Sequence, residues 1–252
     1  MMSMEQTENI LELDRLTVRF HLKNAEAVTA VDGVSVQIRR GEIFGLVGES
    51  GSGKSTLGRT IAGLYHPESG QCRFLGEQVQ MIFQDPASVL SPRRTIGQSI
   101  MEPLVIRRAG TRAQRKQKAL ELLHLVGLPQ RTFYELPSDF SGGQQQRACI
   151  ARALISEPDF LIADEPVASL DVSLQAQIAE LLRALNRQGM TILFIAHDLS
   201  LIRRLCGRTA VMRHGKIVET ADTAELFSHP QNDYTKQLLH SLPVPDPAYR
   251  EL

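Results

Sequence analysis

Residues Gly48-Glu49-Ser50-Gly51-Ser52-Gly53-Lys54-Ser55-Thr56 lie between an apolar run, Ile43 to Val47, and a segment of helical periodicity. They have the form G-x-x-x-x-G-K-[ST], in which glycines let successive backbone N–H groups curl around phosphate oxygens at a helix start. Lys54 is placed to reach the β- and γ-phosphates, and the Ser55 hydroxyl to ligate Mg²⁺. The alternative is a Gly/Ser-rich turn that happens to contain lysine, but the flanking strand-like and helical segments favour a phosphate loop that binds a nucleoside triphosphate.

The composition is that of an ordinary folded protein. The chain has 252 residues, of which 42% are hydrophobic and 22% charged, so it can bury a full core without disulfides. Lys plus Arg equals Asp plus Glu at 28 each, which leaves no overall basic field to hold a nucleic acid, although a local patch stays open. The three cysteines, Cys72, Cys149 and Cys206, form no C-x-x-C pair, which predicts reduced thiols in a cytosolic protein.

Neither secretion nor membrane insertion is expected. The first 16 residues are rich in acidic side chains and lack a basic end followed by an apolar core, unlike a signal peptide. No apolar run approaches the roughly 18 residues that indicate a membrane helix. A role at a membrane would therefore need a partner.

Two alternating segments, Leu11 to Phe20 and Val34 to Ile38, predict an antiparallel β layer ahead of the phosphate loop. Phe20 ends the first of them, where it could stack on an adenine ring or pack in the core. Short strands are also predicted at Cys72 to Leu75 and at Val79 to Phe83. The second leads to Gln84, either a surface-turn glutamine or a side chain in a ligand crevice.

A helical insert is predicted from Pro92 to Leu136, where strand-like runs vanish. Thr111 and Gln114 have the spacing of a capping box, and Gly127 is a natural stop. The insert carries a dense basic run, which is either a solvated face or a contact for anionic lipid headgroups or for an acidic patch of a partner. Its members are Arg107, Arg108, Arg112, Arg115, Lys116 and Lys118.

A second anion site is predicted at Ser141-Gly142-Gly143-Gln144, which opens a helix of small residues. Several unpaired backbone N–H groups would lie there beside a hydroxyl. One chain is poorly placed to wrap both this site and the phosphate loop around one γ-phosphate. If both face the same phosphate, they must come from two copies of the protein.

Polar side chains follow two buried strands predicted further along the chain. Phe160 to Ala163 leads to Asp164 and Glu165, and Met190 to Ala196 leads to His197. Asp164 suits Mg²⁺, Glu165 suits activation of a water molecule, and His197 suits contact with the γ-phosphate, since strand ends meet at one edge of a sheet. The alternatives are a polar strand terminus and a structural histidine.

Further helices are predicted in the last third of the chain. Asp171 precedes an amphipathic helix that runs to Gly189, and Leu199 to Leu205 forms another. A β-hairpin with a glycine turn is expected over residues 210–219. The tail is expected to hold a short helix from Ala224, followed by His229-Pro230 and the segment from Tyr234 to Leu242.

Together these segments resemble the ATP-binding subunit of an ABC transporter over nearly the whole chain. Gly48 to Ser55 matches the Walker A motif, Gln84 the Q-loop, Ser141 to Gln144 the ABC signature, Phe160 to Asp164 with Glu165 the Walker B motif and catalytic glutamate, Ser169 to Asp171 the D-loop, His197 the switch histidine, and Phe20 the adenine-stacking aromatic. One such motif is weak evidence, whereas six in the family's order are specific.

The resemblance implies an α/β P-loop NTPase of the ABC ATPase type, with a RecA-like core, an N-terminal antiparallel β layer and a helical subdomain. The whole chain would be one such domain, divided into 9–86 (β layer and phosphate-loop part of the core), 87–157 (helical subdomain and signature helix), 158–225 (rest of the core) and 226–252 (tail).

The resemblance also implies a mechanism. Lys54, Ser55 and the loop amides of one chain would hold ATP, while Ser141 and Gly143 of an opposite chain close on its γ-phosphate. Mg²⁺ would be held by Ser55, Gln84 and Asp164. Catalysis would fall to Glu165, with His197 and Gln84, in an ATPase whose turnover drives solute import.

Within the family the chain looks like the oligopeptide, dipeptide and nickel importer branch, on the run Val79 to Pro86 and on His229-Pro230 with Tyr234-Thr235. That branch implies two transmembrane permease subunits, a second and different ATPase chain or a second copy, an extracellular or periplasmic solute-binding protein, and no nucleic acid. The chain would lie peripherally on the cytoplasmic face of the cell's inner membrane. The resemblance predicts a peptide importer, and the alternative is a nickel or metal-chelate importer.

Three departures from the family pattern stand out: Phe140 before the signature, Val167-Ala168 after Glu165, and a short segment between Gly70 and Gln84. The last leaves the cargo subgroup open. Relatives that bind an iron–sulfur cluster carry a group of cysteines near the C-terminus, and this sequence has none there.

Two other classes of protein remain as alternatives, a soluble ABC ATPase that remodels nucleic acid or ribosomes, and a P-loop kinase. The first usually needs a second nucleotide domain or a long coiled coil, and the second an acceptor site in place of Ser141 to Gln144.

Overall fold

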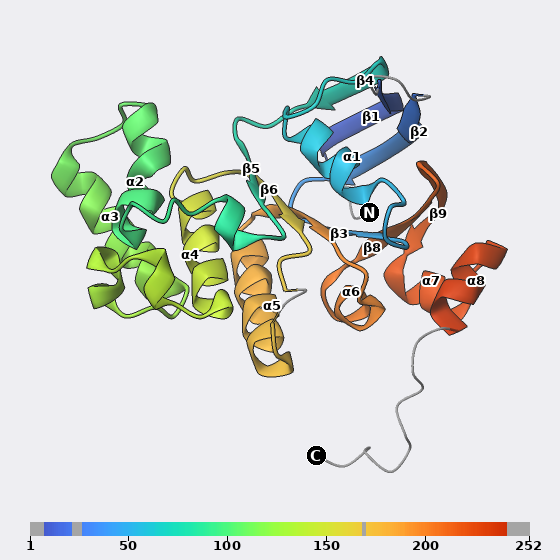
Figure 1. Cartoon of the computed structure of the whole chain (residues 1–252). Helices are drawn as coiled ribbons and strands as arrows, with labels where there is room; N and C mark the ends of the chain where they lie inside the picture. The colour runs from blue at the N-terminus through green and yellow to red at the C-terminus, as the bar shows by residue number, and fades with distance from the viewer. Residues whose placement is uncertain (1–7, 22–26, 168–169, 241–252) are drawn as a thin grey trace, which may run out of the picture.

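The computed structural model describes residues 8–21, 27–167 and 170–240, arranged as two sheets with helices around them (Figure 1). The strands are β1 (Asn9–Phe20), β2 (Val28–Arg39), β3 (Ile43–Val47), β4 (Ser69–Phe74), β5 (Val79–Ile82), β6 (Phe160–Asp164), β7 (Thr191–Ile195), β8 (Arg208–Arg213) and β9 (Lys216–Asp222). The α-helices are α1 (Lys54–Ile61), α2 (Ile96–Ile106), α3 (Arg112–Leu125), α4 (Gly142–Leu154), α5 (Val172–Arg187), α6 (Leu199–Leu205), α7 (Thr223–Ser228) and α8 (Asp233–His240). Short 3-10 helices lie at Pro86–Ser88, Gln130–Tyr134 and Pro137–Asp139.

The predicted antiparallel layer is a three-stranded sheet in the order β2-β1-β4. The prediction placed its second strand at Val34, but β2 begins at Val28, because the ladder continues along β1 until Phe20 pairs with Val28. The strand predicted at Cys72 begins earlier, at Ser69, for the same reason, since Ser69 pairs with Thr17 of β1. Cross-strand pairing thus extends strands beyond the segments that alternate.

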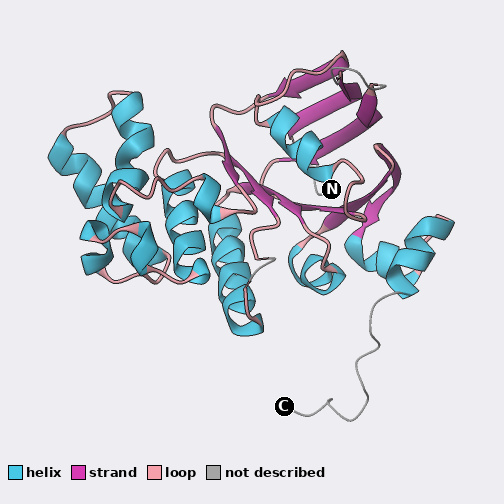
Figure 2. Ribbon diagram, viewed as in Figure 1, coloured by secondary structure: helices cyan, strands magenta, loops and turns pink. Residues whose placement is uncertain are grey.

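The second sheet has six strands in the order β5-β6-β7-β3-β8-β9, and only β9 runs antiparallel to its neighbour. Every residue of β3, β6 and β7 is buried, as expected for parallel strands covered on both faces. The helix α1 and the antiparallel layer cover one face, and α5 and α6 lie on the other (Figure 2).

The two-residue period of the strands divides the core between these faces. Phe44 and Phe160 pack with β1, β2 and α1 in one cluster. Their neighbours Ile43 and Leu161 pack in the other, with α4, α5, α6 and the helical part. The central sheet therefore joins the nucleotide-loop side of the molecule to its helical side.

Parallel pairing brings several strand ends to one edge of the sheet. Leu46 and Asp164 both stand opposite Ile195, and Ile82 stands opposite Ala163. The loops that follow β3, β5, β6 and β7 consequently start side by side. This edge is where α/β proteins bind their ligands.

The predicted helical insert forms α2, α3 and a 3-10 helix beside α4 (Figure 1). The capping box at Thr111 and Gln114 is confirmed, and a second one links Thr95 and Gln98. Part of the basic run is engaged within the chain, since Lys118 pairs with Glu157 at 2.6 Å.

The predicted short tail helix forms as α7, and the start of the segment from Tyr234 lies in α8. Leu242, the end of the last tail segment, lies outside the described residues, as does Ser169 of the predicted D-loop. None of the helices in the described ranges is long and apolar enough to cross a bilayer.

We expect Phe160→Ala to lower the free energy of unfolding by about 3–5 kcal/mol, because it opens a cavity between the two sheets. The Phe160 side chain is 0% exposed, and its ring centroid lies 6.0 Å from that of Phe74. Urea denaturation measures the change. Val105→Ala, in a side chain 50% exposed on α2, is the control and should stay within about 0.5 kcal/mol; equal losses in both variants would contradict the assigned core.

Candidate functional site

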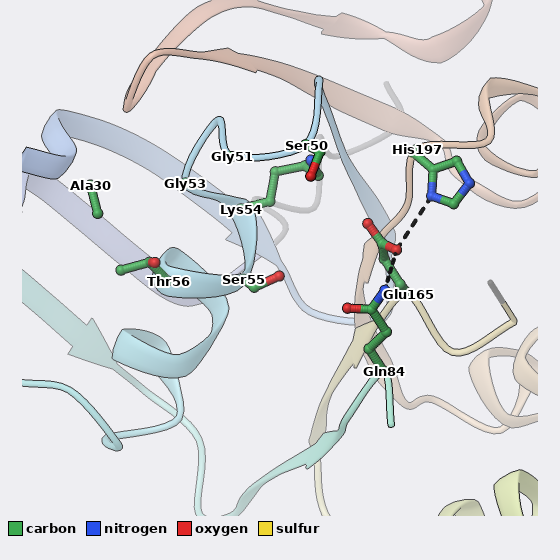
Figure 3. Close-up of a pocket in the computed structure, with 10 residues that line it drawn as sticks. All are labelled: Ala30, Ser50, Gly51, Gly53, Lys54, Ser55, Thr56, Gln84, Glu165 and His197. Atoms are coloured by element: carbon green, nitrogen blue, oxygen red, sulfur yellow. Dashed lines mark hydrogen bonds and ion pairs between the residues drawn. The ribbon is translucent and has the colours of Figure 1, made fainter. Parts of the chain in front are cut away.

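An open cavity of about 520 Å³ lies at the shared edge of the strands (Figure 3). Its volume is in the range of small-molecule sites. Residues from five places in the chain line it: Ala30, Ser50, Gly51, Gly53, Lys54, Ser55, Thr56, Gln84, Glu165 and His197. All but Ala30 were predicted as site residues. Ala30 lies in β2, outside every motif in the sequence.

The predicted phosphate loop joins β3 to α1, and two of its glycines are sterically required. A Cβ on Gly48 would lie 2.1 Å from the Met212 carbonyl oxygen, and one on Gly53 2.1 Å from that of Ala30. Gly53 also has a φ of 106°, which favours glycine. No side chain of the described residues caps α1, so its first N–H groups are available to an anion.

Lys54 is the first residue of α1, and its ammonium group is buried against the loop. Nζ donates hydrogen bonds to the carbonyl oxygens of Gly48 and Glu49, both at 2.8 Å. Burial lowers the pKa of Lys54, and the carboxylates of Glu165, Asp164 and Glu49 partly oppose the shift. Nζ also donates to the Ser52 hydroxyl at 3.4 Å. A cation that is 4% exposed and bonded to uncharged oxygens is suited to receive phosphate oxygens.

Asp164 and Ser55 meet beneath the loop. Ser55 Oγ donates to Asp164 Oδ1 at 2.9 Å, whereas Oδ2 is buried and has no hydrogen-bond partner among the described residues. Burial raises the pKa of Asp164 despite the Ser55 bond and the nearby positive charges. A hydroxyl beside an orphaned carboxylate oxygen fits a small hard cation such as Mg²⁺, which takes few protein ligands and completes its shell with phosphates and water.

Glu165 stands at the next position with its carboxylate between two polar side chains. Gln84 Nε2 donates to Glu165 Oε2 at 2.9 Å, and His197 Nδ1 lies 3.3 Å from the same oxygen. Neither contact uses Oε1. The backbone of Glu165 has a φ of 45°, a left-handed conformation whose strain is typical of functional sites.

Gln84 therefore reaches the crevice rather than lying in a surface turn, and His197 joins it there. Its amide nitrogen contacts Glu165, and its role as a metal ligand beside Ser55 and Asp164 stays a prediction.

Phe20 lies apart from the cavity lining. Its ring packs edge-on against Tyr65, with centroids 5.3 Å apart, and it adds to the core cluster under the antiparallel layer.

The predicted signature does not line the cavity either. Ser141 caps α4 in a reciprocal box with Gln144. A Cβ on Gly143 would lie 2.6 Å from Leu174 Cδ1, so glycine lets α4 approach the start of α5. Asp171 caps α5, with Oδ1 accepting from the Leu174 N–H at 3.0 Å.

Tyr234 is the contact that sequence reasoning missed. Its hydroxyl oxygen accepts a hydrogen bond from the Glu49 N–H at 3.2 Å. The Tyr-Thr pair was read only as a family mark in the tail, because nothing local connects residues so distant in the chain.

Comparison with known proteins agrees with this geometry. A family model described as "ABC transporter" matches residues 31–168. A putative peptide import ATP-binding protein of Brucella ovis is 45% identical over 260 residues, covering 97% of this chain and 82% of that protein. The oligopeptide transport ATP-binding protein OppF of Bacillus subtilis is 46% identical over 261 residues, covering 96% of this chain and 85% of that protein.

Solved structures of similar proteins have the same fold. The dimeric structure of MJ0796, a bacterial ABC transporter cassette, is 28% identical with a TM-score of 0.78, and covers 84% of this chain and 98% of that chain. A dimeric post-hydrolysis state of the same cassette, bound to ADP and phosphate, is 29% identical with a TM-score of 0.77 and the same coverage. The predicted α/β P-loop fold class is confirmed.

We expect Asp164→Asn to raise the free energy of unfolding of the metal-free chain at pH 7 by about 0.5–2 kcal/mol, the usual gain from one stabilising substitution. The carboxyl is 1% exposed, and its raised pKa means that stability falls as pH rises above the unfolded value near 3.8. An amide costs less to bury than an ionised carboxylate. Denaturation in a chelating buffer measures the change.

Asp159→Asn is the matched control and should lower stability, because the Asp159 carboxylate accepts N–H groups from Glu77 and Gln78 at 2.8 and 2.9 Å. If Asp164→Asn also lowered stability, the positive charges around Asp164 would outweigh its burial.

Proposed function

We propose that this chain, which belongs to the ABC transporter family, is the ATP-hydrolysing subunit of an importer that carries peptides. Binding and hydrolysis of ATP follow from the family. The observation that carries the proposal is the joint placement of the phosphate loop, the Ser55–Asp164 pair and Glu165 at one sheet edge. The peptide cargo is supported by the names of the relatives from Brucella ovis and Bacillus subtilis.

The phosphate loop and Lys54 bind the phosphates in this proposal. The N–H groups at the start of α1 face the β-phosphate, and the Lys54 ammonium exchanges carbonyl oxygens for phosphate oxygens. Ser55 and Asp164 would hold Mg²⁺, with the orphaned Oδ2 of Asp164 as the atom best suited to it. Mg²⁺ supplies neutralisation of the charge on the transferring phosphate. The Gln84 amide oxygen, which takes no part in the bond of Nε2 to Glu165, would add to these ligands.

Glu165 is the general base. Its Oε2 is held by Gln84 and His197, so the carboxylate is oriented and Oε1 accepts the proton of the attacking water. His197 Nδ1 keeps Glu165 in place from the end of β7. Because His197 is itself 62% exposed at the side chain, it can also reach a phosphate oxygen in the cavity.

A second ATPase chain completes the site. Ser141 and Gly143 lie outside the cavity of their own chain, on the first turn of α4. An opposite copy, or a different ATPase subunit of the same importer, brings its signature N–H groups to the γ-phosphate. The dimeric state named for both structures of that similar cassette supports this arrangement.

The permease contact lies on the helical part. A groove runs along α2. It holds exposed apolar side chains, with Val105 50% and Ile106 73% exposed. Its lining residues are Arg94, Gln98, Met101, Glu102, Val105 and Ile106. We assign this groove to a cytoplasmic helix of one of two transmembrane permeases, which would hold the chain at the inner face of the cell membrane beside a solute-binding protein.

Coupled ATP hydrolysis tests the function. The chain is purified with its permease subunits in lipid discs, and turnover is measured with the binding protein alone, loaded with a short peptide, or loaded with Ni²⁺. Stimulation by peptide is expected. Stimulation by Ni²⁺ alone would overturn the peptide cargo, and stimulation only by nucleic acid would overturn the importer.

Ile106→Asp is the matched variant of the groove. It should keep the basal hydrolysis of the free chain and lose stimulation in the complex, because a charge in an apolar contact weakens docking. Undiminished stimulation would place the permease elsewhere.

We expect Glu165→Gln to lower hydrolysis by roughly 10²-fold or more while ATP still binds, the size expected for a general base. Turnover and the Kd for ATP measure the two effects. Glu180→Gln, on an exposed position of α5, is the control and should leave turnover unchanged. Full turnover in Glu165→Gln would remove Glu165 from the mechanism.

A further inference from the structure

The C-terminal helix α8 contacts the phosphate loop through one side chain. Tyr234 is 4% exposed, and its hydroxyl oxygen accepts the Glu49 N–H at 3.2 Å, across 185 positions of sequence. We propose that Tyr234 is a positioning residue for nucleotide binding, which holds the first peptide unit of the loop in its phosphate-binding orientation. This inference rests on the proposed ATP site.

The peptide unit between Gly48 and Glu49 is held on both sides. Its N–H donates to Tyr234, and its C=O accepts from Lys54 Nζ at 2.8 Å. In a trans peptide these two groups point in opposite directions. A rotation of this unit that breaks the Tyr234 bond must therefore also turn the Gly48 carbonyl away from the Lys54 ammonium.

Glycine makes this peptide unit free to rotate unless something holds it. Gly48 has a φ of 153°, and steric contact with Met212 excludes a side chain that could restrain it from within the loop. Ordering such a segment when the ligand binds would reduce affinity. A hydrogen bond from outside the loop orders it beforehand.

The tyrosine is itself well anchored. The Arg213 guanidinium at the end of β8 lies 4.5 Å from its ring centroid, and its own N–H donates to Asn232 Oδ1 at 2.9 Å. Burial raises the pKa of Tyr234, so at neutral pH the phenol keeps its proton and acts as an uncharged acceptor.

The helix that carries Tyr234 is fixed to the β8–β9 hairpin (Figure 1). Glu219 of β9 accepts the N–H groups of Gln231 and Asn232 at 2.8 and 3.0 Å. The same hairpin contacts the loop directly, because the Gly215 N–H donates to the Ser52 carbonyl at 2.9 Å. Hairpin and helix therefore both hydrogen-bond to the phosphate loop.

Tyr234→Phe isolates the hydroxyl, since the phenyl ring keeps its packing and its contact with Arg213. We expect the Kd for ATP and the KM of hydrolysis to rise roughly 3- to 10-fold, the loss of one hydrogen bond, with kcat changed by less than about twofold. A fluorescent ATP analogue and steady-state turnover measure the two effects. Tyr134→Phe, in a side chain 65% exposed on the helical part, is the control and should leave both unchanged.

Hydrogen exchange of the nucleotide-free chain separates positioning from general destabilisation. Tyr234→Phe should speed hydrogen exchange at the Glu49 amide. The exchange rates of the β6 amides should stay equal to those of the unaltered chain. Faster exchange throughout, or an unchanged Kd with slow Glu49 exchange, would overturn the positioning role. If the unaltered chain failed to bind ATP, the proposed site would fall instead, so the two failures are distinguishable.

Discussion

The parallel register of β3, β5, β6 and β7 is the constraint on which the site depends. Because Leu46 and Asp164 share Ile195 as their cross-strand partner, the phosphate loop and the acidic strand end start at the same height on the sheet. A slip of one residue would turn Asp164 to the other face. Complete burial of these strands makes such a slip costly, since every residue then exchanges one packed environment for another.

That rigid edge allows charges to be buried before a ligand arrives. Lys54 and Asp164 are nearly inaccessible, and each carries a pKa shift that burial causes. Such groups are destabilising in the free chain, and phosphate oxygens and a hard cation would supply the partners that they lack. The surrounding core, with both sheet faces packed, is what makes this arrangement tolerable.

The supports of the site come from remote parts of the chain. Gln84 and His197 contact Glu165 from two neighbouring strand ends, while the β8–β9 hairpin and α8 hydrogen-bond to the phosphate loop. Ser141 and Gly143 lie outside the cavity, at the capped start of α4.

Local patterns in the sequence determined much of this protein. The phosphate loop, the capping box at Thr111, the buried strands and the helix after Ser141 all follow from residue order over a few positions, because turns, caps and periodicity act over that range. The acidic and histidine strand ends were also predicted to meet, since parallel strands share an edge.

Only the tertiary structure decided the contacts that join distant segments. The start of β2 at Val28, the bond of Gln84 to Glu165, the packing of Phe20 on Tyr65 and the bond of Tyr234 to Glu49 each depend on which of many possible partners the fold brings near. A pattern along the chain can show that a side chain is polar, buried or aromatic. The choice of its partner is made by packing across the whole molecule, where register and burial act together.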